Sequence, residues 1–426
     1  MKKKINHILE LFGHFLIYFS CHFNLPGLCA YIIKISILEN KFIRKNIKKK
    51  NIVIVLDRSI GHRDIEIIKE TSNKSPEFLY LRRSITKIIL FYFCQNKKVF
   101  FNYIKPPVTE KDYFGQSKKN RYDHENFWSK VILNLKKSYK NKNLSFVTFN
   151  FTYYAEIGLY EGCKRNNIQV KLWHKEGIKT NLEAALEAKT WGNKFYHVFD
   201  YFSKISVYNE LVKKMFIKIN KSNSKKTTVN GCPRVKDYIT KKKYYKKINT
   251  LLFLSFDKKR GIPEYKENKN KNWSLSYNIV IDILNDLSNN KNLKILIKKK
   301  SNTTHQKISN LNKNIEVFSQ GTAQKFINQA DIIIGHNSAS TIEAIVNGKY
   351  VMVPFFEKNI RLKKYLYNFN KELIYTSKEN MKKSILNLIN KKVLFPLSNQ
   401  KHKKTITYYL GNNQNTTEKY LRFLRN

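Results

Sequence analysis

The chain has 426 residues, of which 42% are hydrophobic and 14% aromatic, enough apolar material for two or three domains and too much for a disordered chain. Its formal charge is +50, from 69 lysines and 12 arginines against 31 acidic residues. Surfaces that bind nucleic acid favour arginine for bidentate contacts. Here lysine rises together with asparagine and isoleucine even in featureless loops, as an AT-rich genome would produce. We therefore interpret most of the charge as solvated surface and expect no nucleic-acid partner.

Residues 1–50 form the first predicted segment, an N-terminal amphipathic helical stretch. Polar residues such as Glu10, His14 and Lys34 interrupt it, so no apolar run is long enough to span a bilayer, and no cleavage site of a signal peptide follows it. Two interpretations stay open. The segment is a helical pair packed on the first domain, or it is an interfacial helix whose lysines, Lys2–Lys4 with Lys48–Lys50, contact anionic lipid.

The five cysteines are widely scattered and follow neither a zinc spacing nor a disulfide framework. This usage fits a reducing cytosol. We therefore expect a cytoplasmic protein, either free or in peripheral contact with the inner face of the cytoplasmic membrane.

From Asn51 onward, short apolar runs alternate with longer amphipathic stretches, which indicates βα units and parallel sheets. The predicted strands, in chain order, are Ile52–Leu56, Phe78–Leu81, Val99–Tyr103, Leu144–Phe149, Val170–Trp173, Ile205–Tyr208, Leu251–Phe256, Lys294–Ile297, Glu316–Phe318, Ile332–Ile334 and Tyr350–Val353. The predicted helices are Arg63–Thr71, Ile85–Cys94, His124–Tyr139, Ala155–Asn166, Asn181–Thr190, Glu210–Ile219, Ser276–Leu287, Ala323–Asn328, Ser340–Asn347 and Lys378–Asn390.

Gly231 and Pro233 follow a polar stretch over 220–226, and this punctuation predicts a boundary between two α/β halves. We expect a first Rossmann-like domain over 51–230, which binds the acceptor, a second over 231–400, which binds the donor, and a C-terminal helix over 401–426. Two such parallel-sheet domains facing each other place a ligand in the cleft between them, at the carboxyl ends of the strands.

The clearest site signal is ADIIIGHNSASTIEAIVNGKYVMVPF, from Ala330 to Phe355. A buried strand ends at a glycine, and a polar cluster then opens a helix, whose free N–H groups and dipole form an anion site suited to a diphosphate. The candidate donor-binding residues are His336, Asn337, Ser338, Ser340, Thr341 and Glu343, with Glu343 expected in the first helical turn as an acceptor for sugar hydroxyls. An ordinary S-x-x-E capping box formed by Ser340 and Glu343 is the structural alternative.

This string resembles the donor-binding region of two-domain GT-B glycosyltransferases of the surface- and capsular-polysaccharide type. Similar families are the CDP-glycerol glycerophosphotransferases and, in the same fold, the UDP-N-acetylglucosamine 2-epimerases. Val229–Tyr238 (VNGCPRVKDY) is similar to their linker segment Gly-x-Pro-Arg-x-Asp, and Asn51–Glu66 to their first strand and glycine loop. The resemblance covers roughly Asn51 to Asn390 and implies a nucleotide-sugar donor as substrate, with no cofactor.

Three further candidate sites for substrate follow from these segments. Gly61 is expected at the turn that faces the cleft, and the turn of Gly61, His62, Arg63 and Asp64 could hold acceptor or phosphate groups. Arg234 could reach the donor phosphate, or it forms a structural ion pair with an acid. Lys298 stands where the family often has Lys-x-His-Pro, but Lys299, Lys300 and Ser301 follow it, so it is either a phosphate ligand or one more exposed lysine.

The candidate catalytic base lies in LWHKEG, from Leu172 to Gly177, where a strand ends. Residues two apart on a strand share one face, so His174 and Glu176 could both reach the cleft. Glycosyl transfer requires that the acceptor hydroxyl lose its proton as it attacks, a task for a histidine or a glutamate of raised pKa. A strand end with solvated polar residues is the alternative.

The sequence contains no P-loop, no Gly-x-Gly-x-x-Gly, no nucleophile elbow, no metal-ligand spacing and no Asp-x-Asp. The resemblance implies a transferase that moves a sugar, or a phosphorylated polyol, from a nucleotide donor to a surface polysaccharide or lipid-linked glycan, and the lack of Asp-x-Asp fits the metal-independent chemistry of that fold. A sugar-nucleotide 2-epimerase of the same fold is the first alternative. A basic protein that binds nucleic acid or anionic lipid without catalysis is the second.

Overall fold

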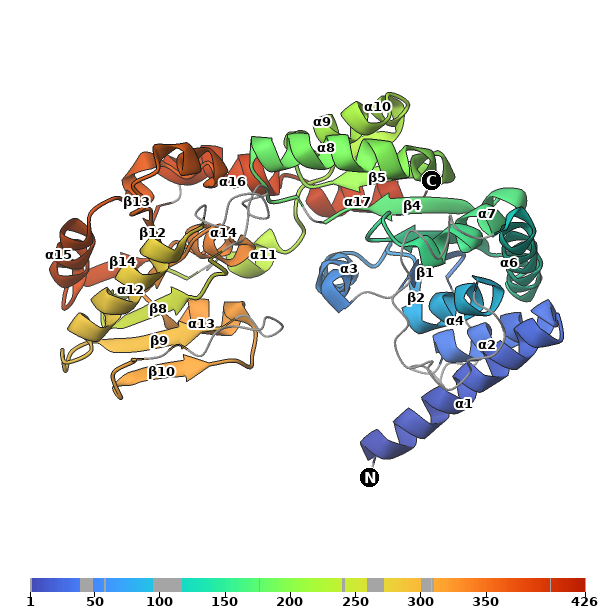
Figure 1. Cartoon of the computed structure of the whole chain (residues 1–426), viewed down its shortest axis with the longest axis horizontal. Coiled ribbons are helices and arrows are strands. Elements are labelled where there is room, and N and C mark those ends of the chain that lie inside the picture. Colours follow the sequence, from blue (N-terminus) through green and yellow to red (C-terminus); the bar gives the residue numbers. More distant parts are fainter. Residues whose placement is uncertain are drawn as a thin grey trace.

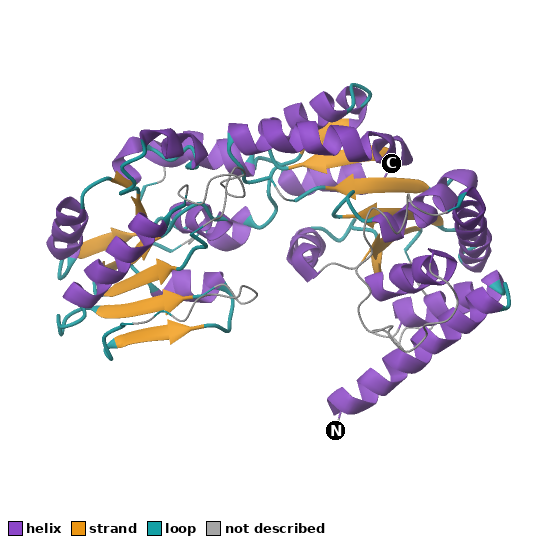
Figure 2. Ribbon diagram, in the orientation of Figure 1, coloured by secondary structure: helices purple, strands orange, loops and turns teal. Residues whose placement is uncertain are grey.

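The computed structural model describes residues 2–38, 49–56, 59–94, 117–175, 177–239, 242–258, 272–299, 308, 310–398 and 400–425. Two six-stranded sheets organise these residues into two lobes, which lie at opposite ends of the molecule (Figure 1; Figure 2). Every strand pair within the two sheets is parallel. The fold is α/β with two Rossmann-like sheets, as the sequence predicts.

The first lobe is built on strands in the order β2-β1-β3-β4-β5-β6. The strands are β1 (Asn51–Leu56), β2 (Glu77–Leu81), β3 (Asn143–Thr148), β4 (Gln169–Trp173), β5 (Phe202–Val207) and β6 (Thr227–Val229). The helices are α1 (Lys2–His22), α2 (Pro26–Leu38), α3 (Ser59–Thr71), α4 (Arg83–Cys94), α6 (Lys118–Ser138), α7 (Ile157–Arg165), α8 (Asn181–Phe195), α9 (Glu210–Ile219) and α10 (Asn223–Lys226), with 3-10 turns η2 (Tyr154–Glu156) and η3 (Tyr196–Tyr201). The predicted strand Val99–Tyr103 lies outside the described residues.

The second lobe has the strand order β10-β9-β8-β11-β12-β13. Numbered from its own first strand this order is 3-2-1-4-5-6, the Rossmann order. The strands are β8 (Thr250–Leu254), β9 (Lys294–Lys298), β10 (Ile315–Phe318), β11 (Ile332–Ile334), β12 (Tyr350–Pro354) and β13 (Ile374–Tyr375). The helices are α12 (Ser274–Leu287), α13 (Ala323–Gln329), α14 (Ala339–Val346) and α15 (Lys378–Leu388), with 3-10 turns η5 (Ile360–Tyr365), η6 (Lys371–Leu373) and η7 (Gln400–His402).

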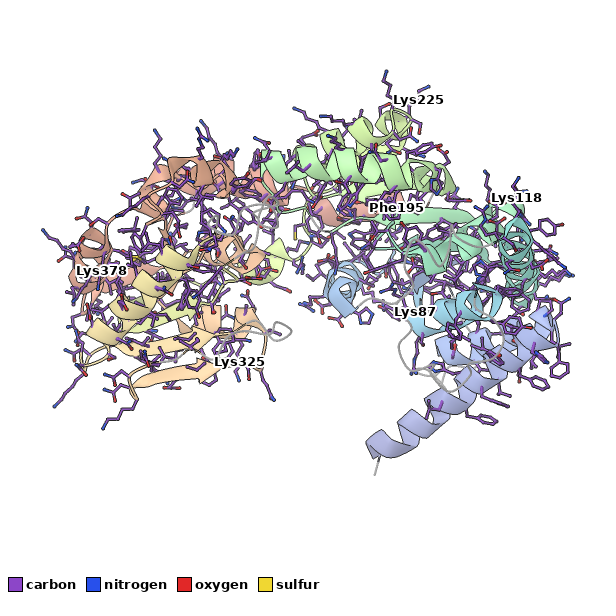
Figure 3. The ribbon with its side chains drawn as sticks, viewed as in Figure 1. Lys87, Lys118, Phe195, Lys225, Lys325 and Lys378 are labelled. Atoms are coloured by element: carbon purple, nitrogen blue, oxygen red, sulfur yellow. The ribbon has the colours of Figure 1, made fainter. Side chains whose placement is uncertain are left out.

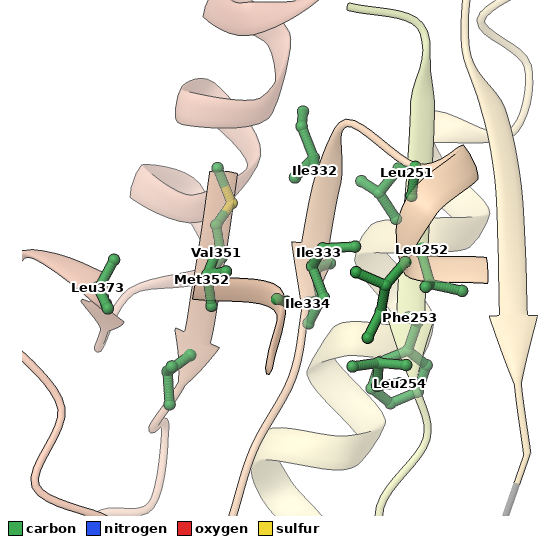
Figure 4. Close-up of a cluster of buried hydrophobic side chains, with 14 of the residues drawn as sticks. Leu251, Leu252, Phe253, Leu254, Ile332, Ile333, Ile334, Val351, Met352 and Leu373 are labelled. Carbon is green, nitrogen blue, oxygen red and sulfur yellow. The ribbon is translucent and has the colours of Figure 1, made fainter. Parts of the chain in front are cut away.

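Continuous hydrophobic runs in the strands explain both sheets. In the first sheet, Ile52 and Ile54 belong to a core beneath α4, α6, α7, α8 and α9, whereas Val53 and Val55 belong to a core on the other face. In the second sheet, β8 and β11 are buried along their whole length (Figure 4). Continuous apolar strands of this kind are the signature of a parallel sheet covered on both faces.

Short elements escaped the sequence prediction. These are β6, β13, the helix α11 (Val235–Tyr238) and an antiparallel pair of β7 (Tyr244–Lys247) with β14 (Lys392–Phe395). Each has two to four residues, and β7 and β14 carry lysines, so none of them shows a strong apolar period.

The end of the chain forms two helices where one was expected over 401–426, namely α16 (Lys403–Leu410) and α17 (Thr416–Arg425). Gly411 separates them at φ +76°, a left-handed conformation that ends a helix. α17 returns to the first lobe, where Tyr420 and Leu424 pack in one core with Val53 and Val55. The C-terminal helix therefore covers a face of the first sheet, beside α3 (Figure 1).

Most of the described lysines are at least partly exposed, and five are buried: Lys171, Lys175, Lys179, Lys298 and Lys349. Lys118, Lys225 and Lys325 come from three different helices and are all exposed (Figure 3). This placement agrees with the interpretation of the charge as solvated surface.

Candidate active site

The carboxyl ends of the two sheets approach one another. Asn337, which follows β11, accepts a hydrogen bond from the Tyr367 backbone N–H at 2.8 Å, and the Tyr367 hydroxyl donates to the carbonyl of Ile178 at 3.2 Å. Ile178 lies in the segment that follows β4. One tyrosine therefore connects the loop after β11 in the second lobe to the loop after β4 in the first.

The polar string after β11 forms a rigid turn into α14. Thr341 is fully buried and its hydroxyl donates to the His336 carbonyl at 2.8 Å. The Asn337 amide nitrogen donates to the Tyr365 carbonyl at 2.6 Å. A Cβ on Gly335 would lie 2.4 Å from the Thr341 hydroxyl, so this position requires glycine. Asn337 and Thr341 thus hold the loop by contacts within the protein.

The helix cap differs from the expected one. Ser338 is the N-cap of α14, and its hydroxyl accepts from the Ser340 N–H at 3.3 Å. The capping box of Ser340 and Glu343 is therefore absent, and Glu343 is the fifth residue of the helix rather than part of its first turn. Ser338, Ala339 and Ser340 are partly exposed, whereas the residues on either side of them are buried. The open part of the predicted anion site is this three-residue helix start.

The imidazole of His336 lies inside the second lobe, stacked 4.5 Å from the Phe256 ring and 4.6 Å from the Trp273 ring. Burial lowers its pKa from 6.5 to about 3, so the ring is neutral at neutral pH. Within the described part of the chain, neither ring nitrogen has a hydrogen-bond partner. His336 joins the loops after β8 and β11, which flank the point where the strand order of the second sheet reverses.

A polar cluster between the lobes contains Asp64, Tyr208, Arg234, Tyr238 and Glu343. Arg234 Nε lies 2.9 Å from Asp64 Oδ1, and the Tyr208 hydroxyl donates to Asp64 Oδ2 at 2.5 Å. The Tyr238 hydroxyl donates to Glu343 Oε1 at 2.7 Å, and Arg234 Nη1 lies 4.0 Å from the same oxygen. We call these five residues the interlobe cluster.

The interlobe cluster joins three parts of the chain. Asp64 is in α3 and Tyr208 follows β5, so both belong to the first lobe, whereas Glu343 is in α14 of the second. Arg234 and Tyr238 come from the linker around α11. The sequence singled out Arg234 and Glu343 but not their shared arrangement, and the ion pair proposed as the structural alternative for Arg234 is present.

Electrostatics in the interlobe cluster follow from burial. Desolvation raises the pKa of Asp64, and the charge of Arg234 and the Tyr208 hydroxyl oppose the rise. Desolvation also raises the pKa of Glu343, against the Tyr238 hydroxyl and then Arg234. The buried carboxyls of Asp64 and Glu343 therefore share one guanidinium, that of Arg234.

The remaining substrate candidates lie apart from this cluster. Gly61 is in the first turn of α3 rather than in a loop, because the helix begins at Ser59. A Cβ there would lie 2.2 Å from the Phe149 ring, so the glycine allows α3 to pack on the end of β3. His62 contacts the Tyr80 ring edge-on at 4.7 Å. The Lys298 ammonium, at the end of β9, donates to the carbonyls of Lys299 and Ser319.

The two candidates for the base differ in what the structure shows. His174 is 2% exposed, and its ring lies 4.9 Å from Phe216 of α9 and 6.0 Å from Phe151, on the side of the first sheet that α9 covers. Its side chain therefore does not face solvent. Glu176 lies outside the described residues.

The sequence analysis missed Tyr208, which is 1% exposed, and it named Asp64 only as part of the turn from Gly61 to Asp64. Asp64 is fully buried. A signal for this burial did exist, because Asp64 shares the apolar stripe of α3 with Gly61, Ile65 and Ile68, and an acid on such a stripe needs a buried partner. Among the described residues, no group of three or more His, Cys, Asp or Glu side chains is placed to hold a metal, and no helix is long and apolar enough to cross a membrane.

Comparisons with known proteins give only distant likenesses. No family model matches the sequence, and no curated protein matches it. A putative UDP-N-acetylglucosamine 2-epimerase from Listeria monocytogenes superposes with a TM-score of 0.47 at 11% identity, over 88% of this chain and 95% of that one. UDP-GlcNAc 2-epimerase from Neisseria meningitidis, solved with UDP-GlcNAc, gives 0.47 at 10% over 88% and 99%. The wall teichoic acid polymerase TagF gives 0.47 at 12% over 99% and 97%.

Proposed function

We propose that this protein is a transferase that moves a sugar, or a phosphorylated polyol, from a nucleotide donor to a surface polysaccharide or lipid-linked glycan. One observation carries the proposal: the open start of α14 lies at the carboxyl end of β11, beside the reversal of a sheet with Rossmann strand order. In such sheets nucleotides bind at that reversal, with their phosphates on the N-terminus of a helix. The resemblance of 330–355 to a donor-binding region supports the same position.

In this proposal the donor diphosphate binds the N–H groups and hydroxyls of Ser338 and Ser340. The neutral His336 adds a hydrogen-bond partner beneath it, since a buried imidazole without a partner is rare in proteins. Glu343 orients donor hydroxyls, and Arg234 supplies the positive charge that a leaving diphosphate requires. The donor is a substrate, and the proposal includes no cofactor and no metal.

The acceptor binds in the first lobe. We assign the base to Glu176 or His174, in the segment after β4, because Tyr367 ties this segment to the loop before α14. In either case the base removes the proton from the acceptor hydroxyl while that oxygen attacks the donor, and the nucleotide leaves with the bonding electrons. If Glu176 is the base, His174 can remain buried during the reaction.

The test is a thermal-shift screen of the full chain with UDP-, CDP-, GDP- and CMP-sugars, repeated on two charge variants. Ser340→Glu places a carboxylate at the second residue of α14, and Gln324→Glu places one at the second residue of α13, after β10. Both changes favour the helix dipole by about 0.3–1 kcal/mol, so neither should unfold the protein. We expect one nucleotide class to raise the melting temperature of the wild type and of Gln324→Glu, and not of Ser340→Glu.

Three results would contradict the proposal. If no nucleotide stabilises the wild type, or if Ser340→Glu keeps the full shift, the donor does not bind at α14. Epimerised sugar released without any acceptor would favour the 2-epimerase. Steeply salt-dependent binding to nucleic acid, unchanged in Glu343→Ala and Glu176→Ala, would favour a binding protein without catalysis.

A further inference from the structure

The hairpin of α1 and α2 exposes an unusual amount of apolar surface. α1 buries Ile17, Ser20 and Cys21 against the first lobe, where it packs on α2 and α4. Its opposite side carries Phe12, Phe15 and Phe19, and Phe23 follows directly after the helix; these four rings are 38–59% exposed. α1 is thus apolar on both sides, although only one side is packed.

This exposure is concentrated in one place. Of the 18 large hydrophobic side chains exposed in the described residues, eight belong to this hairpin: Leu11, Phe12, Phe15, Phe19, Phe23, Leu25, Tyr31 and Ile35. We call them the hairpin face. Single exposed apolar residues are normal, but a group of this size on one helical hairpin, with Phe15, Phe19 and Phe23 in ring contact, marks an interaction surface. The hairpin lies at the outer edge of the first lobe, away from the second (Figure 1).

The charge near the hairpin face is predominantly positive. Between Leu11 and Leu38 the only Lys, Arg, Asp or Glu is Lys34, whose ammonium lies 5.7 Å from the centre of the Tyr139 ring. Lys137 and Lys140, on either side of Tyr139, are exposed. Over residues 1–50 the sequence has ten Lys and Arg against two acids. An apolar surface next to an excess of lysines is complementary to a surface that is apolar below and anionic above.

We propose that the hairpin face docks on an anionic lipid bilayer, with the phenylalanines in the headgroup–acyl boundary and the surrounding lysines on lipid phosphates. A second copy of the chain is the less suitable partner, because pairing two hairpin faces would bring lysine-rich surfaces of the same sign together. The hairpin lies in the interface rather than crossing it, since no described helix is long and apolar enough to span a membrane. The proposal does not depend on the donor site.

The test is co-sedimentation of the full chain with vesicles of phosphatidylcholine alone and with added phosphatidylglycerol. Phe12→Ser with Phe23→Ser removes two rings that are 59% and 55% exposed, and the matched control is Tyr196→Ser with Tyr245→Ser, at 56% and 66%. We expect binding to the anionic vesicles only, reduced on the order of tenfold by the hairpin pair and unchanged by the control pair. Phe15→Trp should show a blue shift in emission when the same vesicles are added.

Three results would overturn the proposal. The first is equal binding of the two double variants to anionic vesicles. The second is an emission of Phe15→Trp that does not change when they are added. The third is a dimer in sedimentation velocity, without lipid, that the hairpin pair dissociates, since this would assign the face to a second copy of the chain.

Discussion

Arg234 and Asp64 form an ion pair between the linker and the first lobe, with 2.9 Å between Arg234 Nε and Asp64 Oδ1. The Asp64 side chain is fully buried, and the Arg234 side chain is 23% exposed. We expect Arg234→Ala to lower the free energy of unfolding by about 3 kcal/mol, because it leaves a buried carboxylate without its positive partner. Arg234→Lys should lower this free energy by less, because it keeps the positive charge and loses only the branched set of N–H donors of the guanidinium. Urea denaturation measures both.

The chain offers a matched control for this pair. Arg63 binds Asp237 in α11 through two hydrogen bonds of 2.6 and 2.7 Å, but its side chain is 43% exposed. Water screens an exposed pair, so Arg63→Ala should cost less than about 1 kcal/mol. Equal losses in the two alanine variants would mean that burial does not decide the contribution of Arg234.

The α/β organisation was predictable because the strands that define it are strongly patterned. β8 and β11 are uninterrupted apolar runs, and the step from Ile334 through Gly335 into a polar helix start has a single physical interpretation, a βα turn. Elements of two to four residues, such as β6 and β13, are too short to show a hydrophobic period and could not be predicted.

The contacts that build the candidate site depend on residues far apart in the chain. A sequence shows that Arg234 follows Gly231 and Pro233, but not that α3 brings Asp64 to it. Likewise, Tyr420 near the C-terminus packs against Trp173 in β4, a contact set by the tertiary fold alone. The position of His336 between two aromatic rings also depends on Trp273, which is remote from it in sequence.

His336 predicts a specific dependence of stability on pH. Its pKa is about 3 in the folded protein and 6.5 as a free side chain, so between these values the unfolded chain binds a proton that the folded chain does not. This contribution to stability is complete above pH 6.5 and is lost as the pH falls toward 3. His336→Phe should therefore reduce the slope of unfolding free energy against pH by about 1.4 kcal/mol per pH unit within this window.

Urea titrations at several pH values between 6.5 and 4 measure that slope. Ile333→Val in β11, a buried change that removes no titratable group, is the control and should keep the wild-type slope. A wild-type slope in His336→Phe would show that the imidazole is protonated in the folded protein.

The docking of α17 predicts that the C-terminus stabilises the first lobe. The Tyr420 ring stacks on Trp173 at 4.2 Å between centroids, and its hydroxyl donates to the Gly231 carbonyl at 3.0 Å. Tyr420→Ala should lower the unfolding free energy of this lobe by about 3–5 kcal/mol, as for other buried aromatic residues. Arg422→Ala, on the same helix at 80% exposure, should stay within about 0.5 kcal/mol of the wild type.

Tryptophan fluorescence can report this lobe separately. Trp128, Trp173 and Trp191 lie in the first lobe, so a Trp273→Phe background removes the signal of the second. An unchanged denaturation midpoint in Tyr420→Ala would show that α17 is not docked on the first sheet in solution.

Tyr238 and Glu343 predict a coupling across the linker. The hydroxyl of Tyr238 donates to Glu343 Oε1 at 2.7 Å, and burial already raises the pKa of this carboxyl. Tyr238→Phe should cost about 1–3 kcal/mol of unfolding free energy, because it leaves a buried acceptor without its donor. Glu343→Gln keeps an oxygen that can accept from the hydroxyl, so it should cost less than Tyr238→Phe. The double variant Tyr238→Phe, Glu343→Gln completes a cycle in denaturant titrations, and a coupling energy near zero would mean that the two side chains do not interact.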